Sequence, residues 1–447
     1  MAAGDDRVCF SAHRGAAAGA LRALRAALGR VWSDKRRQVP LASVVALALT
    51  GACLVFAWFR FRLYAHPAAP GGAAFTDLND FVLVGRMALS GRLAQAYALP
   101  TMHLAQIADG SGGIFMPWAY PPPYDLLTVG LARLGLAWGF VALSVLPFLT
   151  TLWLIRRLAG PWSGAVAIGL FPGFRICLMC GQNGFLTATL LGAFALAGLK
   201  RSAVAGVPLG LLVIKPHLGL LVGVQNLLMG RWRVLAAAFA VAVALSAAAS
   251  FAFGAPVWLW FLQASRGAAL ALEQGRYTLH YMISPYATLR AAGLPAQVAF
   301  AVQSVLALAA VALTWLLIHR RVDPRLTQGL VLLMSLAVTP YAFDYDTPIL
   351  AIAAAVLAGP VLERARRWQA AVLLALSWVV SGSVLFSWLY VPADAGAGPE
   401  PWAHQAISFA GPGYVALILL VFWILRRQLV PVALRQPAAA GLALSPG

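Results

Sequence analysis

Apolar runs of nearly twenty residues recur along the chain and are separated by polar segments. A continuous run of roughly 20 apolar residues is typical of a transmembrane helix, whereas a transmembrane β-strand alternates apolar and polar residues. Because these runs are continuous and rich in Ala and Leu, they predict an all-α polytopic membrane protein with about 10–13 transmembrane helices. The candidate spans are about 41–59, 124–135, 136–155, 162–179, 184–199, 203–229, 233–254, 296–318, 325–340, 347–361, 368–390 and 411–425.

The remaining segments divide the chain into three predicted parts. Residues 1–39 are polar and basic, residues 40–428 hold all the apolar runs, and residues 429–447 form a tail. We expect a cytoplasmic arm, a transmembrane domain and a flexible end, respectively. Two long segments, about 60–123 and 255–292, interrupt the membrane domain and are predicted to be its large outer loops.

The composition adds a strong basic excess, with 33 basic and 14 acidic residues and a formal net charge of +19. Such an excess can indicate nucleic-acid binding, but here it falls in short clusters between apolar runs, as the positive-inside rule predicts. We therefore expect no nucleic-acid partner, a multi-pass position in the cell (inner) membrane, and cytoplasmic N- and C-termini. The clusters are the N-terminal arm, Arg231 with Arg233, Arg320 with Arg321 and Arg325, Arg364 with Arg366 and Arg367, and Arg426 with Arg427.

The spacing of these clusters tests the topology. An even number of candidate spans separates each cluster from the next, so all of them can lie on the cytoplasmic side. Arg156 and Arg157 fall on the opposite side in this scheme, which leaves the middle of the chain unassigned. Both long loops then lie on the outer face.

The few acidic residues gather on that outer side. Nine of them lie in the predicted outer loops or at their membrane edges, and no acidic residue stands at the centre of a confident span. Proton-coupled transporters place ionisable groups within the membrane, so this distribution favours chemistry at the outer interface. The nine are Asp77, Asp80, Asp109, Asp125, Glu273, Asp344, Asp346, Asp394 and Glu400.

Two pairs of carboxylates within this set are candidates for chemistry. Asp77 and Asp80 are three residues apart, which places them on one face of a helix, where one could act as a general base on a hydroxyl group. The alternative is that they cap that helix and favour its dipole. Asp344 and Asp346 could contact a substrate or simply begin the helix that follows Pro348.

Cationic side chains near the same loops could bind an anion. Lys215 stands in an apolar stretch before Pro216 and His217, where a charge is costly unless it faces a polar cavity, an anion or, by snorkelling, the interface. Arg276 and His280 lie among tyrosines, a composition that suits an anionic or sugar ligand and equally an interfacial aromatic belt.

Uncharged residues complete the set of candidates. Gln182 and Asn183 form a polar turn between two apolar runs and could bind a ligand or cap a helix. The aromatic and proline-rich segment 115–124 would break a helix at headgroup depth. Cys177 and Cys180 form a single CxxC pair without a second pair, so buried helix positions explain them better than zinc, and we expect no metal and no cofactor.

Taken in order, short motifs resemble glycosyltransferase family 87, the polyprenol-phosphate-mannose-dependent mannosyltransferase type of the GT-C superfamily. The resemblance covers about 41–426. The motifs are Asp80-Phe81 leading through Gly91 to Tyr97, Tyr120-Pro-Pro-Pro123, Gly181-Gln-Asn-Gly184, Lys215-Pro-His217, Ser284-Pro285 with Leu289-Arg290, and Thr339-Pro-Tyr with Asp344-Tyr-Asp346.

The resemblance implies a GT-C-like bundle with a large first outer loop, and a hexosyltransferase that takes a sugar such as mannose from a polyprenyl-phosphate donor. It implies inverting transfer to a glycan or glycolipid acceptor, with an acid of the first loop as base. Asp80 matches the family's early Asp best, Asp77 is the second candidate, and His280 resembles a later family histidine.

The residues fit that chemistry, since a leaving phosphate needs cations more than a general acid. Lys215, His217, Arg276 and His280 are the available cations. Tyr97, Trp118 and Tyr120 could line the path of the sugar or the prenyl chain among membrane lipids. Two alternatives stay open at this point, namely a transporter or flippase of lipid-linked sugars, and a non-catalytic membrane scaffold.

Overall fold

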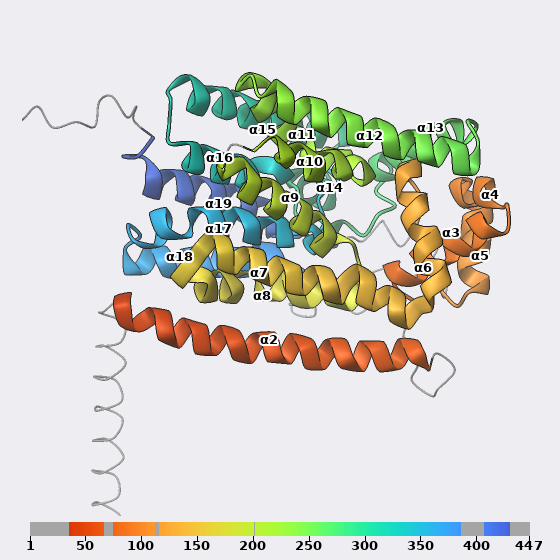
Figure 1. The fold of residues 1–447 in the computed structure, drawn as a ribbon, viewed down its shortest axis with the longest axis horizontal. Coiled ribbons are helices and arrows are strands. Elements are labelled where there is room, and N and C mark those ends of the chain that lie inside the picture. The colour runs from red at the N-terminus through yellow and green to blue at the C-terminus, as the bar shows by residue number, and fades with distance from the viewer. Residues whose placement is uncertain (1–34, 67–74, 112–115, 201, 386–405, 430–447) are drawn as a thin grey trace, which may run out of the picture.

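The computed structural model describes residues 35–66, 75–111, 116–200, 202–385 and 406–429, and within them it confirms the predicted all-α polytopic fold (Figure 1). Most of the predicted arm and nearly all of the predicted tail lie outside the described residues. The helices are α2 (Lys35–Ala65), α3 (Asp77–Leu89), α4 (Leu93–Tyr97), α5 (Leu99–Ala108), α6 (Pro122–Phe140), η1 (Val141–Val145), α7 (Leu146–Ala159), η2 (Gly160–Trp162), α8 (Ser163–Cys180), α9 (Gly184–Leu199), η3 (Ala203–Ala205), α10 (Gly206–Leu211), η4 (Leu212–Ile214), α11 (Pro216–Leu228), α12 (Trp232–Phe253), α13 (Val257–Glu273), η5 (Leu279–Tyr281), α14 (Pro285–Ala291), α15 (Ala296–His319), α16 (Pro324–Met334), η6 (Ser335–Val338), η7 (Asp344–Asp346), α17 (Pro348–Leu362), α18 (Arg367–Gly382) and α19 (Ala410–Leu425).

Several of these helices are long and apolar enough to cross a bilayer. Within the described residues, six helical segments reach at least 18 residues with high hydropathy. They are Val39–Ala65, Pro122–Cys180, Trp232–Phe253, Ala296–His319, Asp344–Leu362 and Arg367–Leu385, and four shorter apolar helices are Gly184–Leu199, Ala203–Ile214, Pro324–Val338 and Ala410–Leu425.

The centre of the bundle is α17. This helix is apolar all round and most of its residues are buried, because α7, α8, α9 and α16 pack against it on several sides. A helix without a polar face can be buried in this way or can face lipid. Its first turn directly follows Asp344 and Asp346, so the core of the bundle fixes the position of both carboxylates.

The outer helices α2, α12 and α15 present large apolar side chains outward. Trp58, Phe59, Phe239, Phe251 and Leu308 are all more than half exposed. A water-soluble monomer rarely exposes so much contiguous apolar surface, whereas a lipid-facing surface requires it. These exposed faces therefore mark the perimeter that contacts lipid.

The predicted boundary between 135 and 136 coincides with a kink at Gly135, but the first of the two predicted spans is not a separate crossing of the bundle. The pattern predicts two spans at 124–135 and 136–155, but Gly135 has φ 72° and ψ 174° between two helical parts of α6. The part of α6 before Gly135 crosses the end of the bundle, and the part after it continues through η1 into α7 (Figure 1). Only one helix therefore traverses the bundle here.

This kink also resolves the position of Arg156 and Arg157. Arg325, which belongs to a predicted cytoplasmic cluster, donates a 2.6 Å hydrogen bond to the carbonyl oxygen of Leu158 and a 3.1 Å bond to that of Val356. The end of α7 therefore lies beside the other arginine clusters, and not on the opposite side.

The predicted span at 203–229 is broken in two. Lys215 has φ −145° and ψ 71°, which separates η4 from α11. A Cβ on Gly206 would clash with the carbonyl oxygen of Val234, and one on Gly210 would clash with that of Ala238. Helices α10 and α12 therefore run side by side in the same direction, and α11, which lies between them in sequence, returns the chain to the end where α10 began.

The first predicted loop also starts later than expected. Helix α2 continues past position 60 and ends at Ala65. The short helices α3, α4 and α5 then gather at the end of the bundle away from the arginine clusters, beside α13 from the second predicted loop (Figure 1). Both long loops thus supply helices to one end of the bundle.

Candidate active site

Helix α3 positions Asp77 and Asp80, and neither carboxylate caps it. The Asn79 side chain takes that role, because its Oδ1 accepts a hydrogen bond from the backbone N–H of Thr76 at 3.1 Å. At Gly85 the helix lies so close to α6 that a Cβ would clash with the backbone oxygen of Thr128. This close packing fixes α3, and both carboxylates are available for contacts with other elements.

Asp80 is directed toward α5. Its Oδ1 accepts a 2.7 Å hydrogen bond from Gln106 Nε2, which also donates to the carbonyl oxygen of Met116 at 2.6 Å. Asp80 is 5% exposed. Gln106 was not identified from the sequence, and nothing in the local pattern distinguishes it from other polar residues of the loop.

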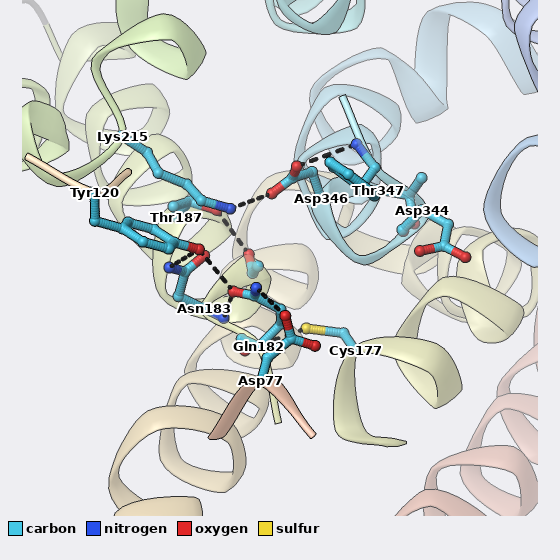
Figure 2. A network of polar contacts seen from close by, with 12 residues as sticks. Asp77, Tyr120, Cys177, Gln182, Asn183, Thr187, Lys215, Asp344, Asp346 and Thr347 are labelled. Atoms are coloured by element: carbon cyan, nitrogen blue, oxygen red, sulfur yellow. Dashed lines mark hydrogen bonds and ion pairs between the residues drawn. The ribbon is translucent and has the colours of Figure 1, made fainter. Parts of the chain in front are cut away.

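Asp77 instead faces the turn between α8 and α9 (Figure 2). Its Oδ1 accepts a 2.8 Å hydrogen bond from Gln182 Nε2, and Gln182 Oε1 accepts from the backbone N–H of Asn183 at 2.9 Å. The Tyr120 hydroxyl donates to Gln182 Oε1 at 3.3 Å and accepts from Asn183 Nδ2 at 3.4 Å. The predicted residues Asp77, Tyr120, Gln182 and Asn183 therefore form one network.

Lys215 reaches the same region from the break between η4 and α11. Its Nζ donates to Asp346 Oδ1 at 2.9 Å, and Asp346 Oδ2 accepts from the Phe343 backbone N–H at 3.3 Å. The ammonium also lies 5.8 Å from the Tyr120 ring centroid and 5.0 Å from that of Tyr345. Lys215 is 5% exposed, so it pairs with a carboxylate inside the bundle and does not snorkel to the interface.

The turn at residues 181–184 holds these parts together through its two glycines. Gly181 caps α8 with φ 66°, and a Cβ there would lie 2.8 Å from Leu78 Cβ on α3. A Cβ on Gly184 would clash with the carbonyl oxygen of Tyr345. A side chain at either position would push away the elements that carry Asp77 or Asp346.

Burial changes the acidity of the two aspartates on α3. It raises the pKa of Asp77 to about 6, although the hydrogen bond from Gln182 and the charge of Lys215 both lower it. Burial raises the pKa of Asp80 to about 8, against the hydrogen bond from Gln106 and with the added repulsion of Asp77. At neutral pH Asp77 is therefore the ionised carboxylate of the pair.

A second polar centre lies behind Tyr120. Asp125 Oδ2 lies 2.6 Å from the Tyr97 hydroxyl, and Asp125 Oδ1 accepts from Trp118 Nε1 at 3.1 Å. Tyr97 and Trp118 also line a cavity of about 240 Å³ between α4 and α13, together with Trp260. Asp125 therefore orients the two predicted aromatic residues at that cavity.

The second predicted loop is fastened to the segment that carries Asp344 and Asp346. Met282 and Phe343 form a β-bridge, in which the Ile283 backbone N–H donates to the Ala342 carbonyl oxygen at 2.9 Å. Asp344 is buried, and its Oδ2 has no hydrogen-bond partner within the described part of the chain. The structure thus joins two segments some sixty residues apart in sequence.

The four predicted phosphate-binding residues occupy different places. His217 lies close enough to Lys215 and Asp346 to interact with their charges. His280 packs edge-on against the Tyr281 ring at 4.4 Å, and burial lowers its pKa, so it is neutral at pH 7. Arg276 is exposed. Lys215 and His217 are therefore the two that lie at the Asp77 network.

The sequence reasoning missed two arginines, Arg60 on α2 and Arg175 on α8. Their presence within apolar helices was the available signal. No group of three His, Cys, Asp or Glu residues in the described segments is placed to hold a metal ion, and Cys177 Sγ donates to the Gln182 carbonyl oxygen at 3.5 Å.

Comparisons with known proteins add a family assignment to this geometry. Searches of curated proteins and of solved structures returned no match. The family model described as glycosyltransferase family 87 matches residues 118–340, a region that includes Tyr120, Gln182, Asn183 and Lys215. The protein is therefore a glycosyltransferase with membrane-type helices, and the chain belongs to glycosyltransferase family 87.

Proposed function

We propose that this glycosyltransferase moves a hexose from a polyprenyl-phosphate donor to the hydroxyl group of a glycan or glycolipid, with inversion, at the outer membrane face. The observation that carries the proposal is the network in which Asp77 and the Lys215–Asp346 pair meet around Tyr120 and Gln182. In this network a carboxylate that is ionised at neutral pH lies close to a buried cation (Figure 2).

Asp77 is the better base of the two candidates. A general base must be deprotonated near the working pH and must reach the proton that it accepts. The pKa of Asp77 is about 6 and that of Asp80 about 8, and Asp77 is also the less buried residue. We therefore assign proton removal to Asp77, and to Asp80 the role of holding α3 against α5 through Gln106.

Lys215 is the cation best placed for the leaving phosphate. An ammonium has three N–H donors, and the bond to Asp346 occupies one of them. Negative charge develops on the phosphate as the bond to C1 breaks, and a fixed cation in a buried site stabilises that charge. His217 lies beside Lys215, and His280 lies in the neighbouring loop.

The aromatic cavity suits the sugar end of a substrate. Its volume of about 240 Å³ is below the range of drug-sized binding sites, and Tyr97, Trp118 and Trp260 present ring faces and edges. We assign it to a sugar ring and leave the prenyl chain to the lipid around the bundle. Asp125 holds the aromatic lining in place through its bonds to Tyr97 and Trp118.

The distribution of charge supports the outer location. The clusters at Arg156, Arg320, Arg364 and Arg426 lie at the end of the bundle away from α3, and such clusters favour the cytoplasmic side. The Asp77 network would then face outward. A donor carried on a lipid is the form of activated sugar that a site at this end can receive directly from the membrane.

The experiment is a transfer assay in proteoliposomes with a panel of polyprenyl-phosphate hexoses, in which release of the prenyl phosphate is measured. The test variant is Asp77→Asn, and Asp109→Asn is a matched control. Asp109 lies in the same loop region and pairs with Arg86 at 3.4 Å at the surface. We expect loss of release in the first and wild-type release in the second. Release from none of the lipid donors by wild type would refute the donor assignment.

A further inference from the structure

Two arginines inside the helical bundle lie near one another without a carboxylate partner among the described residues. They are Arg60 on α2 and Arg175 on α8. Arg60 is only 8% exposed. Its Nε atom is buried without a hydrogen-bond partner in the described part of the chain, and so is the Nη1 atom of Arg175. Arg175 packs over Phe56, which lies one helical turn before Arg60 on α2, so the two guanidinium groups are close enough to repel each other. An uncompensated pair of cations at such a place is costly and calls for an anion.

Aromatic rings hold both guanidinium groups in place. Arg60 lies 4.7 Å from the Tyr64 ring centroid and donates to the Tyr64 hydroxyl at 2.6 Å. Arg175 lies 3.5 Å from the Phe56 ring centroid. These contacts orient the positive charges and reduce their cost, but they do not neutralise them.

Ordinary snorkelling does not explain this arrangement. Arg60 lies five residues before the end of α2, and Arg175 five residues before the end of α8, which is roughly 7.5 Å from each helix end at 1.5 Å per residue. A long basic side chain at that depth normally extends to water. Arg60 remains buried instead, although the neighbouring Phe59 is 61% exposed on the lipid-facing side of the same helix.

A short path of hydrogen bonds connects these arginines to Asp77. The Tyr64 hydroxyl bonded to Arg60 lies 2.8 Å from Thr76 Oγ1, and Thr76 immediately precedes Asp77. Gly181 of the central turn is also near, since a Cβ there would lie 3.6 Å from the Tyr64 hydroxyl. The arginine pair therefore lies beside the Asp77 network, on the side where the peripheral helix α2 packs.

We propose that Arg60 and Arg175 form a docking site for the phosphate of a prenyl monophosphate lipid, which reaches the Asp77 network past α2. The proposal rests on the proposed function and adds a site to it. Lys215 already has Asp346 as a partner, whereas the two arginines carry charge that the described protein does not balance. Guanidinium groups bind phosphate oxygens in planar, two-point contacts, which suits this ligand.

The test measures binding of a prenyl monophosphate to the full-length protein in detergent, by native mass spectrometry, with the corresponding prenol as the uncharged reference. We expect Arg60→Met and Arg175→Met each to weaken binding of the phosphate at least tenfold and to leave the prenol unchanged. The matched control is Arg157→Met, because Arg157 also stacks on a ring, Trp153 at 5.4 Å, but at the opposite end of the bundle. Wild-type affinity in both test variants would overturn the proposal.

Further arms separate the docking site from a purely structural pair of arginines and from a phospholipid site. Without ligand, the melting temperature of Arg60→Met should be no lower than that of wild type, because the substitution removes an unbalanced charge. A lower melting temperature together with an unchanged affinity for the prenyl phosphate would indicate a structural role and overturn the proposal. Equal displacement of the prenyl phosphate by phosphatidylglycerol would assign the site to phospholipid and overturn the prenyl assignment. Binding that depends on both arginines, in a protein that transfers no sugar from any lipid donor, would support this site while the proposed function fails.

Discussion

The pH dependence of transfer distinguishes Asp77 from Asp80 as the base. A carboxylate acts as a base only when it is deprotonated, so the rate falls as pH falls through its pKa. With a pKa of about 6, Asp77 is about 9% deprotonated at pH 5 and about 91% at pH 7. We therefore expect kcat/KM to rise about tenfold over that interval and to be flat above it.

A base at Asp80 would give a different profile. With a pKa of about 8, its tenfold rise would fall between pH 7 and pH 9. The assay is initial-rate release of prenyl phosphate at subsaturating donor, since kcat/KM reports the ionisation of the free enzyme described here. A rise of kcat/KM with its midpoint near pH 8 would refute the assignment of Asp77 and favour Asp80.

Substitution provides the second half of this test. Loss of a general base typically lowers the rate by about 10²–10⁴-fold, so Asp77→Asn should leave only a small and pH-independent rate. Asp80→Asn removes a carboxyl that is largely protonated at neutral pH and keeps a side chain that can accept from Gln106. It should retain most activity. A full rate in Asp77→Asn together with an inactive Asp80→Asn would reverse the two roles.

Three further predictions concern stability. Lys215→Met should lower the melting temperature, because it leaves Asp346 buried without its cation at a cost of about 3–5 kcal/mol, and Lys215→Met with Asp346→Leu should regain stability without activity. Gly184→Ala should abolish both folding yield and transfer, as measured by size-exclusion chromatography and release, whereas Gly223→Ala, which has open space around it, should leave both intact. Between pH 4 and pH 8 the folded protein keeps the proton on Asp80, whereas the unfolded chain releases it. The free energy of unfolding should therefore fall by up to about 1.4 kcal/mol per pH unit as pH rises. The same dependence of the unfolding free energy on pH in Asp80→Asn would contradict this prediction.

Hydrophobic pattern predicted the fold class well, because continuous apolar runs leave few alternatives to membrane helices. It failed where a helix bends without losing apolar character. The helices are interrupted at Gly135 and at Lys215, both within apolar runs. Hydropathy shows neither the direction in which a helix bends nor whether the chain reverses its direction after the break. The corrected path places Arg156 with the other arginine clusters, which the charge pattern alone could not decide.

The candidate residues were easier to identify than their partners. Lys215 and Asp346 were each recognisable, since a charge in an apolar segment needs a partner, but they are 131 residues apart and only the fold brings them together. The same is true of Asp77 and Gln182, 105 residues apart. The resemblance to the family favoured Asp80 over Asp77. The direction of each side chain, which depends on α5 and on the 181–184 turn, is our reason for proposing Asp77 instead.

The bridge between Met282 and Phe343 has a mechanical consequence for the site. It ties the second loop to the short stretch of backbone that ends in Asp344 and Asp346, and the Ser284 hydroxyl strengthens the tie by donating to the Pro340 carbonyl oxygen at 2.8 Å. A displacement of this loop would therefore be transmitted to the carboxylate that pairs with the Lys215 ammonium. The position of the second loop and the environment of the buried Lys215–Asp346 pair are thereby coupled through this bridge and the Ser284 hydrogen bond.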